Sequence, residues 1–239
     1  MNSWELQIDC QKGDLSLSIE LSGDSCPLAL MGANGSGKST VLRAALGLEN
    51  LQRGYFRVGE QVLHDSSQAI SVPVEQRKLA YLPQGLGLFP HMTVAKNIIF
   101  ADPESALSES GLKDRYSGLL SELKVVDLLQ RFPGELSAGE RQKVALVRLM
   151  IQQPRMVLLD EPASALDILA RREVRKVLAS QLSSLGIPTL LVTHDFRDVQ
   201  ELGAKMAYLK DGKIEGVGSL EDFLKGETDE FLREFLAQP

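Results

Sequence analysis

The sequence predicts an α/β fold: a mostly parallel sheet flanked by helices, with an N-terminal antiparallel β region and an inserted helical subdomain. Three observations support this prediction. A glycine-rich segment at residues 32–40 (GANGSGKST) lies between an apolar run and a helical pattern. Two later apolar runs end in polar residues, at Asp160-Glu161 and at His194-Asp195. The stretch 85–152 has mainly helical periodicity.

The N-terminal segment alternates apolar and polar residues, with Trp4, Leu6 and Ile8 followed by a second alternating run from Leu15 to Leu21. This period of two predicts two half-buried antiparallel strands joined near Gly13. After them, Pro27–Met31 is a short apolar run typical of a buried strand, and residues 41–48 continue at helical spacing. The glycine-rich segment therefore lies between a strand and a helix.

Residues 32–40 fit G-x-x-x-x-G-K-[ST], a pattern that forms a phosphate-binding loop. Inward-pointing N–H groups and the positive end of the new helix favour an anionic polyphosphate such as ATP. Lys38 is predicted to bridge the outer phosphates and the Ser39 hydroxyl to hold Mg²⁺. An ordinary glycine turn would explain Gly37 but not Lys38 followed by Ser39. The expected ATP contacts in this loop are Gly32, Ala33, Asn34, Gly35, Ser36, Gly37, Lys38, Ser39 and Thr40.

The remaining elements complete a phosphate-loop nucleoside triphosphatase core. β structure is predicted at residues 54–62, 78–82, 156–159, 188–193, 205–209 and 213–217, and a helix from about residue 167 to 184. We assign residues 1–84 and 153–218 to the ATP-binding core, 85–152 to the helical subdomain and 219–239 to a C-terminal helical tail. The whole chain is treated as one domain.

A buried strand, residues 156–159, delivers two adjacent carboxylates to its C-terminal end. Ligands bind at this edge of parallel α/β sheets. Asp160 is predicted to hold Mg²⁺ through water, and Glu161 to orient and polarise the water that attacks the γ-phosphate. A polar strand end followed by a turn at Pro162 is the alternative interpretation of these residues.

Other motif residues also have structural interpretations. Ser137 and Glu140 match a capping box at a helix start, although Gly139 in the first turn is unfavourable unless a ligand approaches the backbone. Ser164 and Asp167 could simply begin a helix. Without further context, His194 and Gln84 could be ordinary polar residues at strand ends.

Composition excludes several classes of protein. A formal net charge of −6 over 239 residues argues against a general nucleic-acid binder. No apolar run approaches the roughly 18 residues that span a bilayer, and the N-terminus does not resemble a secretory signal. Cys10 and Cys26 lack metal-type spacing, and the three histidines are widely separated. We therefore expect a cytoplasmic protein whose positive ligand-binding groups are local.

Six motifs in order make the sequence resemble the nucleotide-binding subunit of ATP-binding cassette (ABC) transporters. They are Gly32–Thr40, Gln84, Leu136–Glu140, Leu158–Pro162, Ser164–Asp167 and His194. The resemblance implies that Gln84 links Mg²⁺ to the helical subdomain and that His194 clamps the γ-phosphate. Ser137, Gly139 and Glu140 would belong to the signature that closes on the ATP of a second copy in a head-to-tail homodimer. Asp167 would communicate across that dimer.

Residues 73–98 (PVEQRKLAYLPQGLGLFPHMTVAKNI) resemble importer subunits, particularly the molybdate, tungstate and sulfate group. The resemblance implies a peripheral ATPase on the cytoplasmic face of the inner or plasma membrane. It would energise import of an oxyanion through a membrane-embedded permease supplied by a separate substrate-binding protein. The surface after Gln84 would receive a short helix of the permease. The alternatives are an ABC ATPase of a non-transport machine such as iron–sulfur assembly, and an exporter or lipoprotein-release ATPase.

The sequence departs from the family pattern in places. The signature reads LSAGE where LSGGQ is usual, so Ala138 and Glu140 affect the contact with the second copy. The aromatic that usually stacks on adenine is missing near Cys10 and Lys12, and Trp4 is a distant substitute. The chain stops soon after Leu236, so we expect no added substrate-sensing β domain. A nucleotide sensor without turnover is disfavoured by Glu161.

Overall fold

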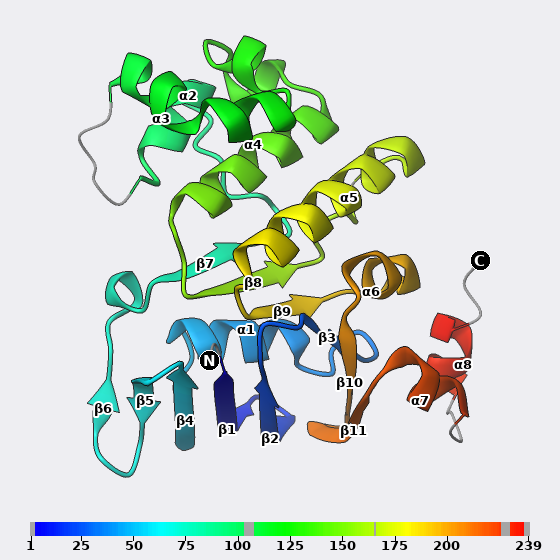
Figure 1. The fold of residues 1–239 in the computed structure, drawn as a ribbon. Coiled ribbons are helices and arrows are strands. Elements are labelled where there is room, and N and C mark those ends of the chain that lie inside the picture. The colour runs from blue at the N-terminus through cyan, green and yellow to red at the C-terminus, as the bar shows by residue number, and fades with distance from the viewer. Residues whose placement is uncertain (1–2, 103–107, 165, 226–229, 237–239) are drawn as a thin grey trace.

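The computed structural model describes residues 3–102, 108–164, 166–225 and 230–236. Within these residues the larger sheet has six strands in the order β11-β10-β3-β9-β8-β7 (Figure 1). Every neighbouring pair is parallel except β10 and β11, which confirms the predicted mostly parallel sheet. The strands are β3 (Leu28–Met31), β7 (Leu79–Leu82), β8 (Met156–Asp160), β9 (Thr189–Val192), β10 (Lys205–Lys210) and β11 (Lys213–Gly218).

A second, antiparallel sheet in the described residues has the order β2-β1-β4-β5-β6. The predicted N-terminal hairpin is confirmed: β1 and β2 pair from Trp4↔Gly23 to Lys12↔Leu15, and Gly13 between them has φ +59°. The predicted β region at 54–62 is the β4–β5 hairpin. β6 is not predicted because two residues are too few to show alternation. The strands are β1 (Trp4–Lys12), β2 (Leu15–Gly23), β4 (Arg53–Val58), β5 (Gln61–Asp65) and β6 (Ile70–Ser71).

The six-stranded sheet is covered on both faces, which explains why its central strands are continuous apolar runs. Helix α1 (Lys38–Leu46) lies between the two sheets (Figure 1). Leu158 of β8 packs into the core that contains α1. Its neighbours Val157 and Leu159 point to the opposite face and into the core that contains α4 (Ala138–Ile151) and α5 (Ile168–Leu185). The phosphate-loop helix and α4 therefore lie on opposite faces of one sheet.

The described residues between β7 and β8 form helices and no strand. In Figure 1, α2 (Val94–Ile99), α3 (Glu109–Glu122) and α4 lie together at the top, beyond the sheet edge made by β7 and β8. Three short 3₁₀ turns are η1 (Val74–Gln76), η2 (Val126–Leu128) and η3 (Pro133–Glu135). No described helix is both long enough and apolar enough to cross a bilayer. The predicted inserted helices are thus present at the predicted place in the chain.

The C-terminal part contains α6 (Phe196–Leu202), α7 (Leu220–Lys225) and α8 (Glu230–Leu236). Aromatic side chains attach α8 to the body of the protein. Phe231 stacks on Tyr208 of β10 with ring centroids 5.7 Å apart, and Phe235 meets Phe196 edge to face at 6.1 Å. Helix α8 therefore packs on β10 and on the start of α6.

Candidate functional site

The glycine-rich segment forms a tight loop between β3 and α1. Gly35 and Gly37 have φ values of +82° and +104°, in the region that favours glycine. A Cβ atom on Gly37 would lie 2.7 Å from a methyl carbon of Leu17, so the loop is also packed too closely for a side chain there. The backbone curls into the start of α1, where unpaired N–H groups collect. This shape suits an anionic ligand.

The side chains of Lys38 and Ser36 place polar atoms inside this loop. The Lys38 ammonium donates to the carbonyl oxygens of Gly32 and Ala33, at 2.7 and 2.9 Å. Burial lowers the pKa of Lys38, while the charges of Glu161 and Asp160 act to raise it. The Ser36 hydroxyl is buried and has no hydrogen-bond partner among the described residues. A buried hydroxyl without a partner and an ammonium group in the same loop fit the oxygens of a bound phosphate.

Asp160 lies at the C-terminal end of β8 between two hydroxyl groups. Ser39 makes a side-chain hydrogen bond to it, and the Tyr81 hydroxyl donates to its Oδ2 at 3.3 Å. Burial raises the pKa of Asp160 above its usual value. Burial and the nearby Asp160 charge raise the pKa of Tyr81 to about 12. The Ser39 hydroxyl and the Asp160 carboxylate are hard oxygen ligands of the kind that Mg²⁺ takes together with substrate phosphates.

The Glu161 carboxylate is held by two other loops. Gln84 Nε2 donates to Oε2 at 3.0 Å, and His194 Nδ1 lies 3.0 Å from Oε1. The backbone of Glu161 has φ +50°, which is unusual for a residue with a side chain, and its N–H donates to Val192 of β9. Strand ends from β7, β8 and β9 thus bring Gln84, Glu161 and His194 together. Gln84 contacts Glu161 rather than Asp160.

The start of α4 has the capping box that the sequence indicates. The Ser137 hydroxyl accepts from Glu140 N at 3.2 Å, and Glu140 Oε2 accepts from Ser137 N at 2.7 Å. Hydrogen bonds from the Ser137 backbone and hydroxyl lower the pKa of Glu140. A Cβ atom on Gly139 would meet Ala170 at 3.4 Å, an ordinary contact. Packing within this chain therefore does not require glycine at position 139.

The segment after Glu161 leads into α5. The Asp167 side chain accepts from Leu169 N and Ala170 N at 3.0 and 2.9 Å, so Asp167 is the N-cap of α5. The Ser164 hydroxyl donates to the Glu161 carbonyl at 3.1 Å. The interpretation that Asp167 begins a helix, with Ser164 just before it, is thus confirmed. Ser164 also donates its backbone N–H to the Glu161 carbonyl, so this residue is attached directly to Glu161.

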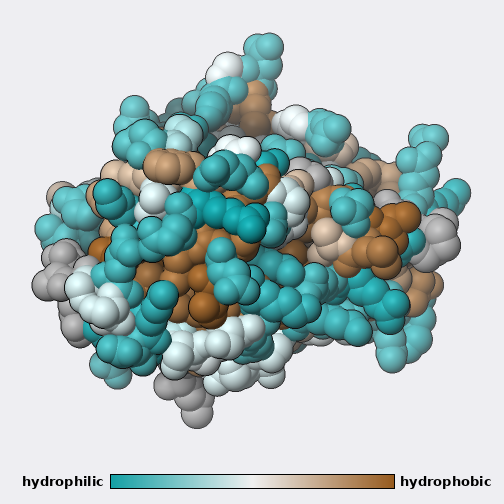
Figure 2. Space-filling model, turned by 90° about the horizontal axis from the view of Figure 1, so that it is seen from above, coloured by the Kyte–Doolittle hydropathy of each residue, from teal (hydrophilic) through white to brown (hydrophobic). Residues whose placement is uncertain are grey.

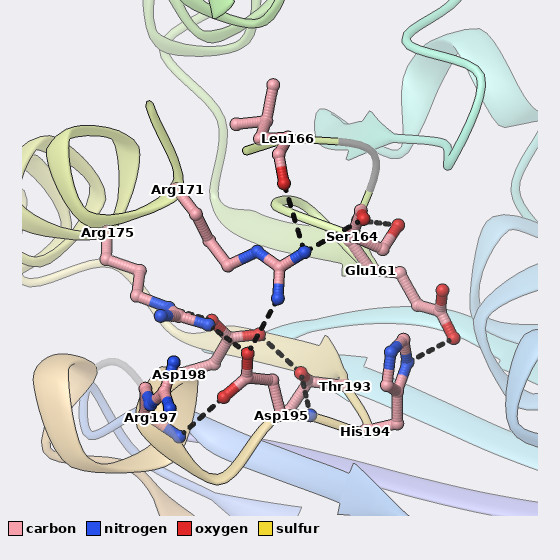
Figure 3. A network of polar contacts seen from close by, with 10 residues as sticks. All are labelled: Glu161, Ser164, Leu166, Arg171, Arg175, Thr193, His194, Asp195, Arg197 and Asp198. Atoms are coloured by element: carbon pink, nitrogen blue, oxygen red, sulfur yellow. Dashed lines mark hydrogen bonds and ion pairs between the residues drawn. The ribbon is translucent and has the colours of Figure 1, made fainter. Parts of the chain in front are cut away.

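An ion-pair network beside His194 is not predicted from the sequence. Figure 3 shows Arg171 and Arg175 of α5 facing Asp195 and Asp198 at the start of α6. The spacing of four between the arginines and of three between the aspartates places each pair on one helix face, and this was the available signal. Only the fold shows that the two pairs meet.

The suggestion that Trp4 replaces the missing adenine-stacking aromatic is wrong. Trp4 is 1% exposed and belongs to the core between the two sheets. Its indole lies so close to Gly23 that a Cβ there would be 2.6 Å from Nε1. The alternation that makes β1 a half-buried strand turns Trp4 inward, because it shares the face of Leu6 and Ile8.

Comparisons with known proteins agree with this geometry. A family profile described as ABC transporter matches residues 16–164. The chain is 39% identical to an Fe(3+) ions import ATP-binding protein of Pseudomonas fluorescens, covering 87% of the chain and 58% of that protein. It is 37% identical to a sulfate/thiosulfate import ATP-binding protein of Agrobacterium fabrum, covering 93% and 63%. It is 34% identical to a molybdenum import ATP-binding protein of Vibrio parahaemolyticus, covering 91% and 58%.

The chain spans about 60% of the length of these relatives. A solved structure titled "Structure of ATP binding subunit of ABC transporter" superimposes with a TM-score of 0.78 and 25% identity, covering all of both chains. This similarity confirms the predicted α/β architecture across the full chain.

The capping box predicts a pH-dependent contribution of Glu140 to stability. A lowered folded-state pKa stabilises the protein above the unfolded value of about 4.3, and this stabilisation disappears as pH falls through the folded pKa. We expect Glu140→Gln to reduce the free energy of unfolding by roughly 0.3–1 kcal/mol at pH 7. Thermal and urea unfolding at pH 7 and pH 3 measure it. A difference that persists at pH 3 would contradict the charge argument.

Glu60→Gln is the matched control for this experiment. Glu60 is exposed in the turn between β4 and β5 and loses the same charge. We expect a change within about 0.5 kcal/mol at both pH values.

Proposed function

The chain belongs to the ABC transporter family, and on that basis we propose that it is the ATP-hydrolysing subunit of an importer. One observation carries the proposal: Lys38, Ser39, Gln84, Asp160, Glu161 and His194 are linked by contacts and charge at one edge of the parallel sheet. A glycine loop supplies the phosphate cradle beside them. Binding a nucleoside triphosphate and attacking it with water requires this combination of groups.

Each residue takes a distinct role in this proposal. The loop amides and Lys38 bind the β- and γ-phosphates of ATP. Ser39, Asp160 and Gln84 would hold Mg²⁺, which when bound would supply positive charge to the phosphate oxygens. Glu161 orients the attacking water and accepts its proton. His194, already in contact with Glu161, donates to the γ-phosphate.

A second copy of the chain completes the site. Helix α4 packs on the opposite sheet face from α1, and Ser137 at its start is exposed. Ser137, Gly139 and Glu140 can therefore contact a nucleotide that is bound by another copy. Because packing within the chain does not require glycine at 139, close approach by a ligand explains its presence. We infer a head-to-tail dimer in which the phosphate loop of one copy and the α4 start of the other enclose each ATP. Asp167 lies at that contact.

The permease contact is assigned to the segment that follows Gln84. Buried Asn97 holds its turn by accepting from Phe89 N at 2.8 Å and donating to carbonyls that include Met92 O at 3.0 Å. Arg148 stacks over Phe89 with 5.1 Å to the ring centroid, and Phe100 beside it is 63% exposed. Figure 2 shows hydrophobic side chains gathered on the face that carries the helical layer. A short permease helix would bury such a surface.

We further propose that the solute is an oxyanion such as molybdate, tungstate or sulfate. Residues 73–98 support this assignment, as do two of the relatives, whose names specify sulfate/thiosulfate and molybdenum import. The subunit would act at the cytoplasmic face of the membrane, with a separate substrate-binding protein outside.

Purification from native membranes tests the importer assignment. We expect the tagged full-length protein to bring down a multi-span permease, since transport energy must pass through that contact. Recovery with an iron–sulfur assembly scaffold or with an export or lipoprotein-release complex instead would contradict the importer assignment while leaving the ATPase proposal intact.

The division of roles between Glu161 and Lys38 gives a kinetic test. We expect Glu161→Gln to bind ATP normally, to lose at least about 100-fold in turnover, and to accumulate as an ATP-bound dimer, because the proton acceptor is removed without altering the phosphate loop. Lys38→Ala should weaken binding by about 1.5–3 kcal/mol, or roughly tenfold or more in Kd. Single-turnover hydrolysis, nucleotide binding and size-exclusion chromatography measure these effects. Normal turnover by Glu161→Gln would reject the assignment.

Lys213→Ala is the matched control for the lysine variant. Lys213 is exposed on β11 and carries the same charge. The ATP affinity of Lys213→Ala should stay within about twofold of the wild type, because an exposed charge away from the phosphate loop contributes little to binding.

The composite site predicts a crosslink between copies. With Cys10→Ala and Cys26→Ala as background, one population carries Ser39→Cys and another Ser137→Cys, both with Glu161→Gln. We expect a disulfide between the two populations only when ATP is bound, because closure brings the phosphate loop of one copy to α4 of the other. Ser71→Cys on β6, at the outer edge of the antiparallel sheet, replaces Ser39→Cys as control. Because Ser39→Cys replaces a proposed Mg²⁺ ligand, ATP binding to that variant is measured first. Absence of the Ser39–Ser137 product while ATP is bound would contradict the head-to-tail arrangement.

A further inference from the structure

One guanidinium joins two loops that the proposed mechanism treats separately. Arg171 Nη2 donates to the carbonyl oxygens of Ser164 and Leu166, at 3.2 and 3.0 Å. Arg171 Nη1 donates to Asp195 Oδ2 at 3.2 Å. Arg171 therefore connects the carbonyls of Ser164 and Leu166 to the residue that follows His194 (Figure 3).

Arg175 fixes Asp195 from the other side. Its Nη2 lies 2.5 Å from Asp195 Oδ2 and its Nε 2.5 Å from Asp198 Oδ1, and the side chain is buried. The Thr193 hydroxyl donates to Asp198 and accepts from Asp195 N at 3.0 Å. Arg175 and Thr193 tie Asp195 to the segment that carries His194. A displacement of Ser164 or Leu166 can therefore reach that segment through Arg171 and Asp195.

The contacts form a closed ring that includes the proposed catalytic carboxylate. Glu161 Oε1 contacts His194, whose backbone continues to Asp195. Asp195 binds Arg171, Arg171 binds the Ser164 carbonyl, and the Ser164 hydroxyl returns to the Glu161 carbonyl at 3.1 Å. A shift of one member of the ring can therefore reach Glu161 and His194 through these contacts.

We propose that Arg171 is a positioning residue that couples the segment 164–167 to His194 and Glu161. This inference rests on the proposed function, in which that segment contacts the second copy. Pressure of the second copy on the segment moves Arg171, and Arg171 sets the distance between the imidazole and the carboxylate. The rate of water attack would therefore depend on whether the dimer has assembled, because displacing a reacting group by about 1 Å can lower the rate by about 100-fold.

The planar fork of arginine is essential to this role. Two carbonyl oxygens and one carboxylate oxygen surround the guanidinium at fixed positions, and its terminal nitrogens reach both sides. A lysine ammonium is a single charge on a flexible stem and cannot bridge both groups with one geometry.

The test compares Arg171→Gln and Arg171→Lys with Arg172→Gln. Arg172 is the next residue on α5, exposed, and loses the same charge. We expect both Arg171 variants to lower kcat by about tenfold or more, with KM and Kd for ATP within about twofold, because the phosphate loop is untouched. Arg172→Gln should leave all three unchanged. In a Glu161→Gln background, Arg171→Gln should still form the ATP-bound dimer.

Asp195→Asn supplies an independent variant that keeps an oxygen acceptor for Arg197 N at the start of α6. If Arg171 acts through Asp195, the double variant Arg171→Gln/Asp195→Asn should be no slower than the slower single variant, within about twofold. If the losses of the two single variants multiply in the double variant, the proposal is overturned. It is also overturned if Arg171→Gln has a kcat within twofold of the wild type, or a raised KM without loss of kcat. Full activity of Arg171→Lys, or failure of Arg171→Gln to form the ATP-bound dimer in the Glu161→Gln background, would overturn it as well.

These outcomes are separate from those that test the proposed function. A wild-type protein without ATPase activity would refute the proposed function itself. If the wild type is an active ATPase and the Arg171 variants have its kcat, only the proposed coupling is overturned. Thermal unfolding of each variant shows whether it is folded, and Asp195→Asn carries the test if Arg171→Gln is not.

Discussion

Two adjacent carboxylates at the end of one buried strand impose the constraint on which the site depends. Asp160 is buried, and the cost of burying its charge is offset by the positive charge of Lys38 and by hydrogen bonds from the hydroxyls of Ser39 and Tyr81. Glu161 turns the other way through an unusual backbone angle and is held by Gln84 and His194. These partners come from different chain segments, so the two acids can lie side by side only where β3, β7, β8 and β9 end together at one edge.

The division of the sheet into two covered faces shapes the proposed assembly. The helix that begins at the phosphate loop is enclosed between the two sheets, whereas α4 belongs to the other core. One copy therefore presents a phosphate loop and a separate capped helix start with glycine in its first turn. The proposed head-to-tail pair would use both surfaces twice, so that each strand edge would be completed by the neighbouring copy.

Helix α5 connects these surfaces. Its N-cap is Asp167, the residue that we propose to lie at the dimer contact. Arg171 and Arg175, one and two turns further on, hold the loop that carries His194. Buried charges of this kind are costly unless each is paired, and here they are paired mainly with one another and with backbone carbonyls. The arrangement gives the α5 start a direct mechanical link to Glu161.

Three local patterns were sufficient to predict the parallel sheet, the N-terminal hairpin and the glycine loop before α1: the glycine pattern, the apolar run before Asp160-Glu161 and the N-terminal alternation. Each is a local relation between residue type and backbone. The same patterns supplied the residues of the site proposed above. Alternation even carried the evidence against Trp4 as a base-stacking residue. The link between Arg171 and Asp195, the hold of Gln84 and His194 on Glu161, and the separation of α4 from α1 came only with the tertiary structure. They join residues distant in the chain, and strand order and helix packing, which no local pattern encodes, bring those residues together.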